Sequence, residues 1–239
     1  MLSLSIALRL LPNSEPLYQI LDFLQICTLP AKSPENAFPF QLQTFAFSDR
    51  KWYNQGQPGG RSKKMIVRLA TLADMNACLS LDHDCVTDHV WQMKVHEAES
   101  QVSVTFYTVR LPRRMQAAYP RNLEQLAEDW QRGEGFLVAE VDGEVRGYVD
   151  LLADPWHQIG WVTNLAVDRG YRRRGIGTAL MHHARQWARK QGLQALLVEA
   201  TTKNYPALCF YQKLGFQFCG FNDHYYPNQD IALFFVRKL

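Results

Sequence analysis

The chain has 239 residues and a formal net charge of +3 at pH 7. Residues 1–64 carry seven Lys/Arg and four Asp/Glu, so they account for the whole net charge of +3. Residues 65–239 are therefore neutral overall and have no net positive charge that would attract nucleic acid or membranes. No apolar run is long enough to span a membrane. The five cysteines contain no Cys-x-x-Cys pair, and no histidine has the spacing of a zinc site. We therefore expect a cytoplasmic protein without disulfides or metal.

Residues 1–64 also differ in composition from the rest of the chain. They contain six prolines, the pair Gly59-Gly60 and few periodic runs, and Met65 stands directly before the first expected strand. The sequence leaves open whether this segment is a disordered tail, an extension from a mis-assigned start codon or a functional appendage. We expect residues 65–239 to be the functional domain.

The first part of this domain is expected to alternate between strands and helices. The expected order is strand, helix, helix, strand, strand, over residues 66–69, 71–81, 122–131, 136–141 and 145–150. Thr71 can cap the first helix, with Asp74 in its first turn. Asp142-Gly143 separates the last two strands and is a strong signal for a two-residue hairpin turn.

The second part continues with strands and amphipathic helices. The expected order is strand, helix, strand, helix, strand, strand, with the strands over residues 161–167, 193–200, 216–221 and 231–237. The first of these helices begins near Gly175 and is ended by Gly192. The second covers residues 205–213, is capped by Asn204 and is ended by Gly215. Cys209 lies on this helix and is expected to be buried.

The most informative stretch is the motif Arg172-Arg173-Arg174-Gly175-Ile176-Gly177-Thr178, between strand 161–167 and the helix. Its two glycines leave the first N–H groups of the helix open to close approach by an anion. The helix dipole and the arginines add positive charge at the same place. These features predict a pyrophosphate site. A Rossmann-type site would need a glycine at Leu180, and a solvated basic loop is the remaining alternative.

The order strand, Arg-x-x-Gly-x-Gly, helix resembles the coenzyme A-binding motif of the GNAT superfamily of acetyl-CoA-dependent N-acetyltransferases. The segment Asn204-x-x-Ala207-x-x-Phe210-Tyr211-x-Lys213-x-Gly215-Phe216 is similar to the second signature of that family. The resemblance covers residues 65–239 and implies an α/β (α+β) fold. It implies a mixed central sheet of about seven strands, flanked by helices, with a V-shaped splay between the fourth and fifth strands. Acetyl-CoA would be the co-substrate.

The resemblance also implies roles for individual residues. The cofactor-binding residues would be Leu165, Ala166, Val167, Arg172, Arg173, Arg174, Gly175, Ile176, Gly177, Thr178 and Asn204. Of these, the backbone of Leu165–Val167 and the side chain of Asn204 would contact the pantetheine arm. Tyr211 would be the general acid that protonates the leaving thiolate, since a phenol with a pKa of about 10 suits that donation. The alternatives are a plain helix cap for Asn204 and a packing aromatic for Tyr211.

The general base is where this sequence departs from the family pattern. Many relatives carry a carboxylate just before the Leu-Ala-Val run, whereas this chain has Thr163 and Asn164 there. Glu199 is the favoured general base, because GNAT enzymes that acetylate protein N-termini have a carboxylate at the same distance from the second signature. A structural carboxylate is the alternative for Glu199. Asp150 is a weaker candidate for the base, and a relay through ordered water is the third.

The sequence says less about the amine that would accept the acetyl group than about the acetyl donor. The long segment before residue 122 mixes acids with aromatics, which suits a cationic amine, although a solvated strand pair is the alternative. These residues are Asp82, Asp84, Asp88, Trp91, Glu97, Glu99, Phe106, Tyr107 and Tyr119. The stretch from Tyr225 to Phe235 resembles streptothricin acetyltransferases, which modify a polycationic antibiotic, and more weakly ribosomal-protein N-terminal acetyltransferases.

Together these resemblances imply acetyl transfer to a primary amine of a small cationic molecule, directly within a ternary complex. A protein N-terminal or lysine amine is the first alternative, and a non-catalytic coenzyme A-binding module is the second. Whether the chain forms a homodimer is left open.

Overall fold

The computed structural model describes residues 65–132 and 134–239. Expectations about residues 1–64 lie outside the described residues. The strands are β1 (Met65–Leu69), β2 (Cys85–Ala98), β3 (Gln101–Ala117), β4 (Gly135–Val141), β5 (Glu144–Asp154), β6 (Ile159–Val167), β7 (Ala195–Thr201), β8 (Gln217–Asn222) and β9 (Ala232–Lys238). The helices are α2 (Met75–Leu79), α3 (Gln125–Gln131), α4 (Ile176–Lys190) and α5 (Tyr205–Lys213), with short 3-10 turns at Leu72–Asp74 and Arg169–Tyr171.

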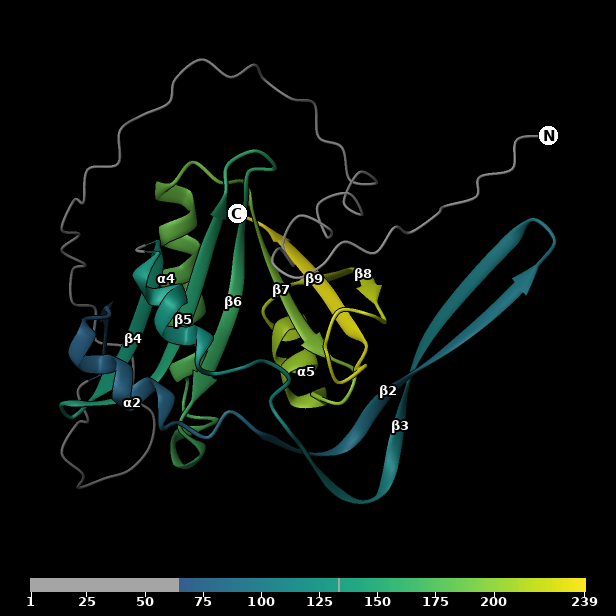
Figure 1. The fold of residues 1–239 in the computed structure, drawn as a ribbon, viewed down its shortest axis with the longest axis horizontal. Helices are drawn as coiled ribbons and strands as arrows, with labels where there is room; N and C mark the ends of the chain where they lie inside the picture. The colour runs from purple at the N-terminus through teal and green to yellow at the C-terminus, as the bar shows by residue number, and fades with distance from the viewer. Residues whose placement is uncertain (1–64, 133) are drawn as a thin grey trace. The chain divides into compact units, whose positions relative to one another are not determined.

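Seven of the strands form one mixed sheet in the order β1-β4-β5-β6-β7-β9-β8, and helices cover both of its faces (Figure 1). The two faces follow from the alternation of side chains along each strand. On β4, Leu137 packs with Leu180 of α4, whereas its neighbour Val138 packs with Leu126 of α3. All four side chains are fully or almost fully buried. The expected α+β architecture with about seven strands is confirmed.

The fourth and fifth strands of the sheet, β6 and β7, separate partway along their length. They pair in parallel only from Ile159 opposite Ala195 to Val162 opposite Val198, and beyond these residues the pairing stops. In Figure 1 the two ribbons diverge from this point. The expected V-shaped splay is therefore confirmed. Because both strands leave backbone groups unpaired there, the splay is a ready place for a ligand to pair with the sheet.

Several local signals in the sequence are confirmed. Asp142 and Gly143 both have positive φ, 54° and 87°, as the two-residue turn between β4 and β5 requires. Asn204 caps α5, because its side-chain oxygen accepts from the N–H of Ala207 at 3.2 Å. Glycines with positive φ follow α4 and α5.

Two helices are shorter than expected, and one residue is more exposed. The helix expected over residues 71–81 begins as a 3-10 turn and becomes α-helical only from Met75 to Leu79. The helix expected from Asn122 begins at Gln125, because the Asn122 side chain accepts from the N–H of Glu124 at 3.0 Å and holds the chain in a turn. Cys209 is exposed, which corrects the expectation of burial, since Leu208 and Tyr211 take the inner face of α5.

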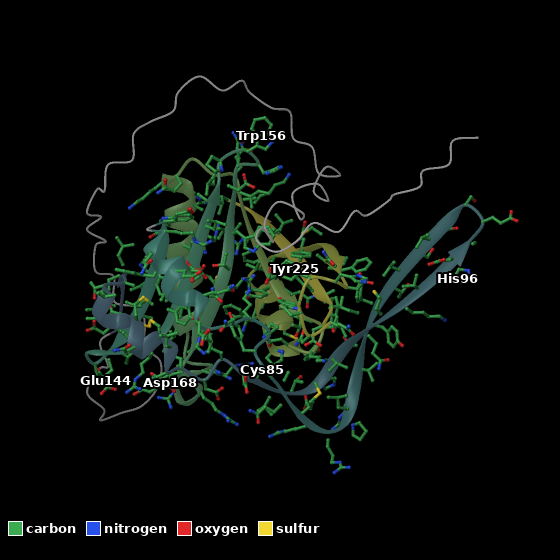
Figure 2. All side chains as sticks on the ribbon, in the orientation of Figure 1. Cys85, His96, Glu144, Trp156, Asp168 and Tyr225 are labelled. Carbon is green, nitrogen blue, oxygen red and sulfur yellow. The ribbon has the colours of Figure 1, made fainter. Side chains whose placement is uncertain are left out.

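The long segment between α2 and α3 forms the hairpin β2–β3, which projects from the sheet (Figure 1). Figure 2 shows Cys85 at the base of this hairpin and His96 near its far end. Trp91 packs against Phe235 and Phe106 against Phe218, with the rings of each pair tilted by about 60°. These aromatics therefore belong to the packing, as the strand-pair alternative predicts.

No helix in the described part of the chain is long and apolar enough to cross a membrane. Within the same residues, no group of three or more His, Cys, Asp or Glu side chains is arranged to hold a metal ion.

Candidate active site

A cavity of about 820 Å³ opens where β6 and β7 separate. Both sequence motifs contribute to its wall. The expected site residues that line it are Leu165, Ala166, Val167, Arg172, Arg173, Gly175, Ile176, Gly177, Thr178, Glu199, Asn204 and Tyr211. Arg174 is the one expected residue that does not. The cavity also takes in Asp82, Asp84, Asp88 and Tyr119 from the long acidic and aromatic segment.

One end of the cavity is the N-terminus of α4. Gly175 precedes the helix with a φ of 87°, and Arg173 has a φ of 65°. Left-handed residues let a tight loop lead directly into the helix, so that the helix N-terminus stays open to the cavity. The first N–H groups of α4 have no partner inside the helix, and its first turn holds no acidic side chain. An anion can therefore approach this helix end.

The three consecutive arginines make different contacts. Arg172 donates from Nε to the carbonyl of Val167 and from Nη1 to that of Asp84, both at 2.9 Å, and from Nη2 to the carbonyl of Asp82. Its guanidinium therefore braces the loop against the segment before β2. Arg174 lies over the ring of Tyr171, 5.1 Å from its centroid. Arg173 is exposed. The cofactor-binding roles of these arginines stay predictions.

The second signature places Asn204 and Tyr211 on the opposite wall. Asn204 uses its side-chain oxygen to cap α5, so its amide nitrogen remains for another partner. Tyr211 is 6% exposed, and no hydrogen bond joins its hydroxyl to the described residues. Burial raises the pKa of the Tyr211 phenol above its usual range, and the nearby charge of Glu199 raises it further. The phenol therefore keeps its proton at neutral pH.

Glu199 of β7 is held by an ion pair that the sequence did not reveal. One oxygen, Oε1, accepts from Nε of Arg121 at 3.1 Å, from Nη2 of Arg121, and from the hydroxyl of Tyr226 at 3.1 Å. The Glu199 side chain is only 3% exposed. Its other oxygen, Oε2, is buried and has no hydrogen-bond partner among the described residues. A buried acceptor without a donor costs about 1–3 kcal/mol, so a ligand that donates there would be stabilised.

A second buried carboxylate lies on β5. Thr163 donates from Oγ1 to Oδ2 of Asp150 at 2.5 Å, and Asn164 donates from Nδ2 to the same oxygen at 3.3 Å. The hydroxyl of Tyr119 in turn donates to Oδ1 of Asn164. Burial raises the pKa of Asp150 to about 6, and the neighbouring carboxylate of Asp129 adds to that effect.

Comparisons with known proteins agree with this geometry. The Acetyltransferase (GNAT) family matches residues 103–216. A streptothricin acetyltransferase from Streptomyces lavendulae is 35% identical over 104 residues, which are 41% of this chain. The match spans only 55% of the length of that relative. An N-alpha-acetyltransferase from Sulfurisphaera tokodaii is 37% identical over 117 residues, which are 44% of this chain and 69% of that protein.

The two subgroup resemblances recur among these matches. A ribosomal protein bS18-alanine N-acetyltransferase from Escherichia coli is 37% identical over 67 residues, 28% of this chain and 45% of that protein. The crystal structure of a nourseothricin acetyltransferase superposes with a TM-score of 0.63 and 25% identity, and covers 73% of this chain and 98% of that one. With the splayed sheet and the two motifs around one cavity, these matches show that the chain belongs to the GNAT family of acetyltransferases.

Proposed function

We propose that the chain transfers an acetyl group from acetyl-CoA to a primary amine of a small cationic molecule. One observation carries this proposal. An open helix N-terminus, a buried tyrosine with a free hydroxyl and a buried carboxylate with an unpartnered oxygen all meet at the cavity between β6 and β7. The relatives named streptothricin and nourseothricin acetyltransferases support a small acceptor.

Acetyl-CoA would bind along the splay. The backbone N–H groups from Arg173 to Thr178 would hold the pyrophosphate at the N-terminus of α4, where the helix dipole favours an anion. The unpaired backbone of Leu165–Val167 and the free amide nitrogen of Asn204 would hold the pantetheine arm. In this arrangement Arg172 would stabilise the loop by its hydrogen bonds to backbone carbonyls, and it would not contact the phosphates.

Tyr211 would serve the leaving group. Its raised pKa keeps the hydroxyl protonated at neutral pH but makes it a weaker acid than a free phenol. A thiolate that leaves the thioester needs a proton or a hydrogen bond. A phenol buried beside the splay can supply either without competition from water.

Glu199, which the sequence favours as the general base, would instead hold the acceptor amine, because its carboxylate is already paired with Arg121. Arg121 and Tyr226 fix Oε1, so the carboxylate cannot turn away, and Oε2 stays free for the donor hydrogens of an ammonium or amine. Charge-assisted hydrogen bonds of this kind are among the stronger ones in proteins. Both substrates would therefore be bound together, as direct transfer requires.

A peptide or protein amine is the second candidate. It is favoured by the relatives named N-alpha-acetyltransferase and ribosomal protein bS18-alanine N-acetyltransferase. Residues 65–239 hold every group that this mechanism uses, so we propose them as the functional unit.

The test is release of free thiol from acetyl-CoA by the full chain, with a panel of cationic small amines, neutral small amines and peptides with free N-termini. We expect the cationic small amines to give the fastest release, and residues 65–239 alone to give the same order. Release with peptides only would support the second candidate. Tight acetyl-CoA binding without release on any amine would point to a non-catalytic module.

A further inference from the structure

Asp150 is a buried carboxylate to which the proposed acetyl transfer assigns no function. It is 4% exposed and lies on β5, one strand away from the splay. Burial of a carboxylate is unfavourable unless hydrogen bonds compensate. Among the residues that the structure describes, Thr163 and Asn164 donate to the Asp150 side chain, both at Oδ2. Both donors line the cavity.

The register of the sheet places Thr163 at the apex of the splay. Asp150 pairs with Asn164 and Leu151 pairs with Val162, so Thr163 is an extra residue that bulges out of β6. Val162 is also the last residue of β6 that pairs with β7. Thr163 and Glu199 are therefore the first residues beyond the last pair on their two strands, and both line the cavity.

The charged and polar groups around Asp150 differ from those around Glu199. Among the described residues, Glu199 is in direct contact with the guanidinium of Arg121, whereas no Lys or Arg side chain bonds to Asp150. The groups that face Asp150 are Asp129 of α3, Arg132 directly after α3, Tyr119 before α3 and Tyr148 of β5, whose hydroxyl bonds to His83. The carboxylate of Asp129 opposes ionisation of Asp150, whereas the guanidinium of Arg132 favours it. Because Arg132 forms an ion pair with Asp129, its effect on Asp150 is weakened.

We propose that Asp150 is the proton acceptor for the acceptor amine, and that the hydroxyl of Thr163 relays the proton from the cavity to it. This proposal rests on the proposed acetyl transfer and gives the carboxylates of Glu199 and Asp150 different roles. Glu199 is held by Arg121 and binds the ammonium through Oε2, and Asp150 takes its proton. The raised pKa of Asp150, about 6, suits a base that must be ionised yet basic near neutral pH.

The protons and electron pairs of this step balance. An N–H bond of the ammonium breaks, its proton passes to Oγ1 of Thr163, and the hydroxyl proton of Thr163 passes to Oδ2 of Asp150. The freed lone pair forms the C–N bond at the thioester carbonyl. When the C–S bond breaks, Tyr211 protonates the thiolate and takes the second proton of the nitrogen. Asp150 then releases its proton to solvent.

The test uses the full chain, acetyl-CoA and the best amine of the panel, with kcat/KM measured against pH. The wild type should gain activity as the pH rises through about 6, where Asp150 ionises. Asp150→Asn should lose ~10²–10⁴-fold in kcat and lose this acidic limb. Thr163→Val should lose at least about tenfold, while Thr163→Ser, which keeps the hydroxyl, should retain most of the rate. Glu199→Gln should raise KM for the amine and keep the limb.

Melting temperature and acetyl-CoA affinity show whether each variant is folded. If Asp150→Asn does not fold, the matched pair Thr163→Val and Thr163→Ser decides, because equal rates for that pair would overturn the relay. The relay is also overturned, with acetyl transfer intact, if Asp150→Asn keeps the limb, or if Glu199→Gln alone removes it. A wild type that acetylates no amine would overturn both the relay and the proposed function.

Discussion

The three adjacent arginines Arg172, Arg173 and Arg174 make different contacts, although they are the same residue type. Arg172 donates hydrogen bonds from its guanidinium to three backbone carbonyls. Arg174 lies over the ring of Tyr171, and Arg173 has a left-handed backbone beside the N-terminus of α4. The sequence predicts a basic loop, but it does not tell which side chain faces a phosphate. That depends on Asp82 and Asp84, which lie far away in the chain and offer their carbonyls.

The phenol of Tyr211 is expected to act on the leaving thiolate. Tyr211→Phe removes only the hydroxyl, so we expect kcat to fall by ~10²–10⁴-fold while acetyl-CoA affinity changes little. Steady-state rates and calorimetry check this. Tyr107→Phe is the matched control, because Tyr107 is exposed on the β2–β3 hairpin, where its hydroxyl donates to Gln92. Equal rates for both variants would mean that Tyr211 only packs.

At the scale of elements, the parts that local chemistry decides could be predicted. The Asp142-Gly143 turn, the Asn204 cap and the two helix-ending glycines follow from backbone conformations that few residues adopt. The sequence offers the hairpin β2–β3 only as an alternative, because charged and aromatic residues alternate there without a clear apolar face. In the structure Trp91 contacts Phe235 of β9 and Phe106 contacts Phe218 of β8, so tertiary packing gives the hairpin an apolar side.

In the site, too, residues with a local sequence signature could be predicted, whereas residues that only the fold brings together could not. The loop before α4 and the residues of α5 carry local signatures, and both are found at the cavity. The ion pair between Arg121 and Glu199 joins residues 78 positions apart, and the bond between Thr163 and Asp150 joins the neighbouring strands β6 and β5. No spacing rule connects such residues, because only the folded sheet brings them together.

The packing of α4 against α5 gives a prediction for the helix N-terminus. A Cβ at Gly177 would lie 3.2 Å from the ring of Phe210, so Gly177→Val would crowd α5 and fill the space beside the first N–H groups of α4. We expect acetyl-CoA affinity to fall at least about tenfold, or ~1.4 kcal/mol. Gly220→Val is the control, because nothing lies within 4 Å of a Cβ there. Unchanged calorimetric affinity in Gly177→Val would contradict the proposed pyrophosphate site.

At the scale of the whole described part, the site is assembled from segments that are distant in the chain. The linker after β3 brings Arg121, the middle of β6 brings Thr163, β7 brings Glu199, α5 brings Tyr211, and the loop before β9 brings Tyr226. The splay of β6 from β7 is what lets these five groups share one cavity. The proposed direct transfer requires the acetyl donor and the acceptor amine to lie side by side, and this cavity is where we propose that both bind.

The most direct measurement follows the acetyl group itself. The full chain is mixed with acetyl-CoA labelled in the acetyl group, first alone and then with the acceptor amine, and protein and products are examined by mass spectrometry. Direct transfer predicts no label on the protein before the amine is added, and then one labelled acetyl group on the amine for each thiol released. Label on the protein before addition, or thiol release without labelled amine, would contradict it.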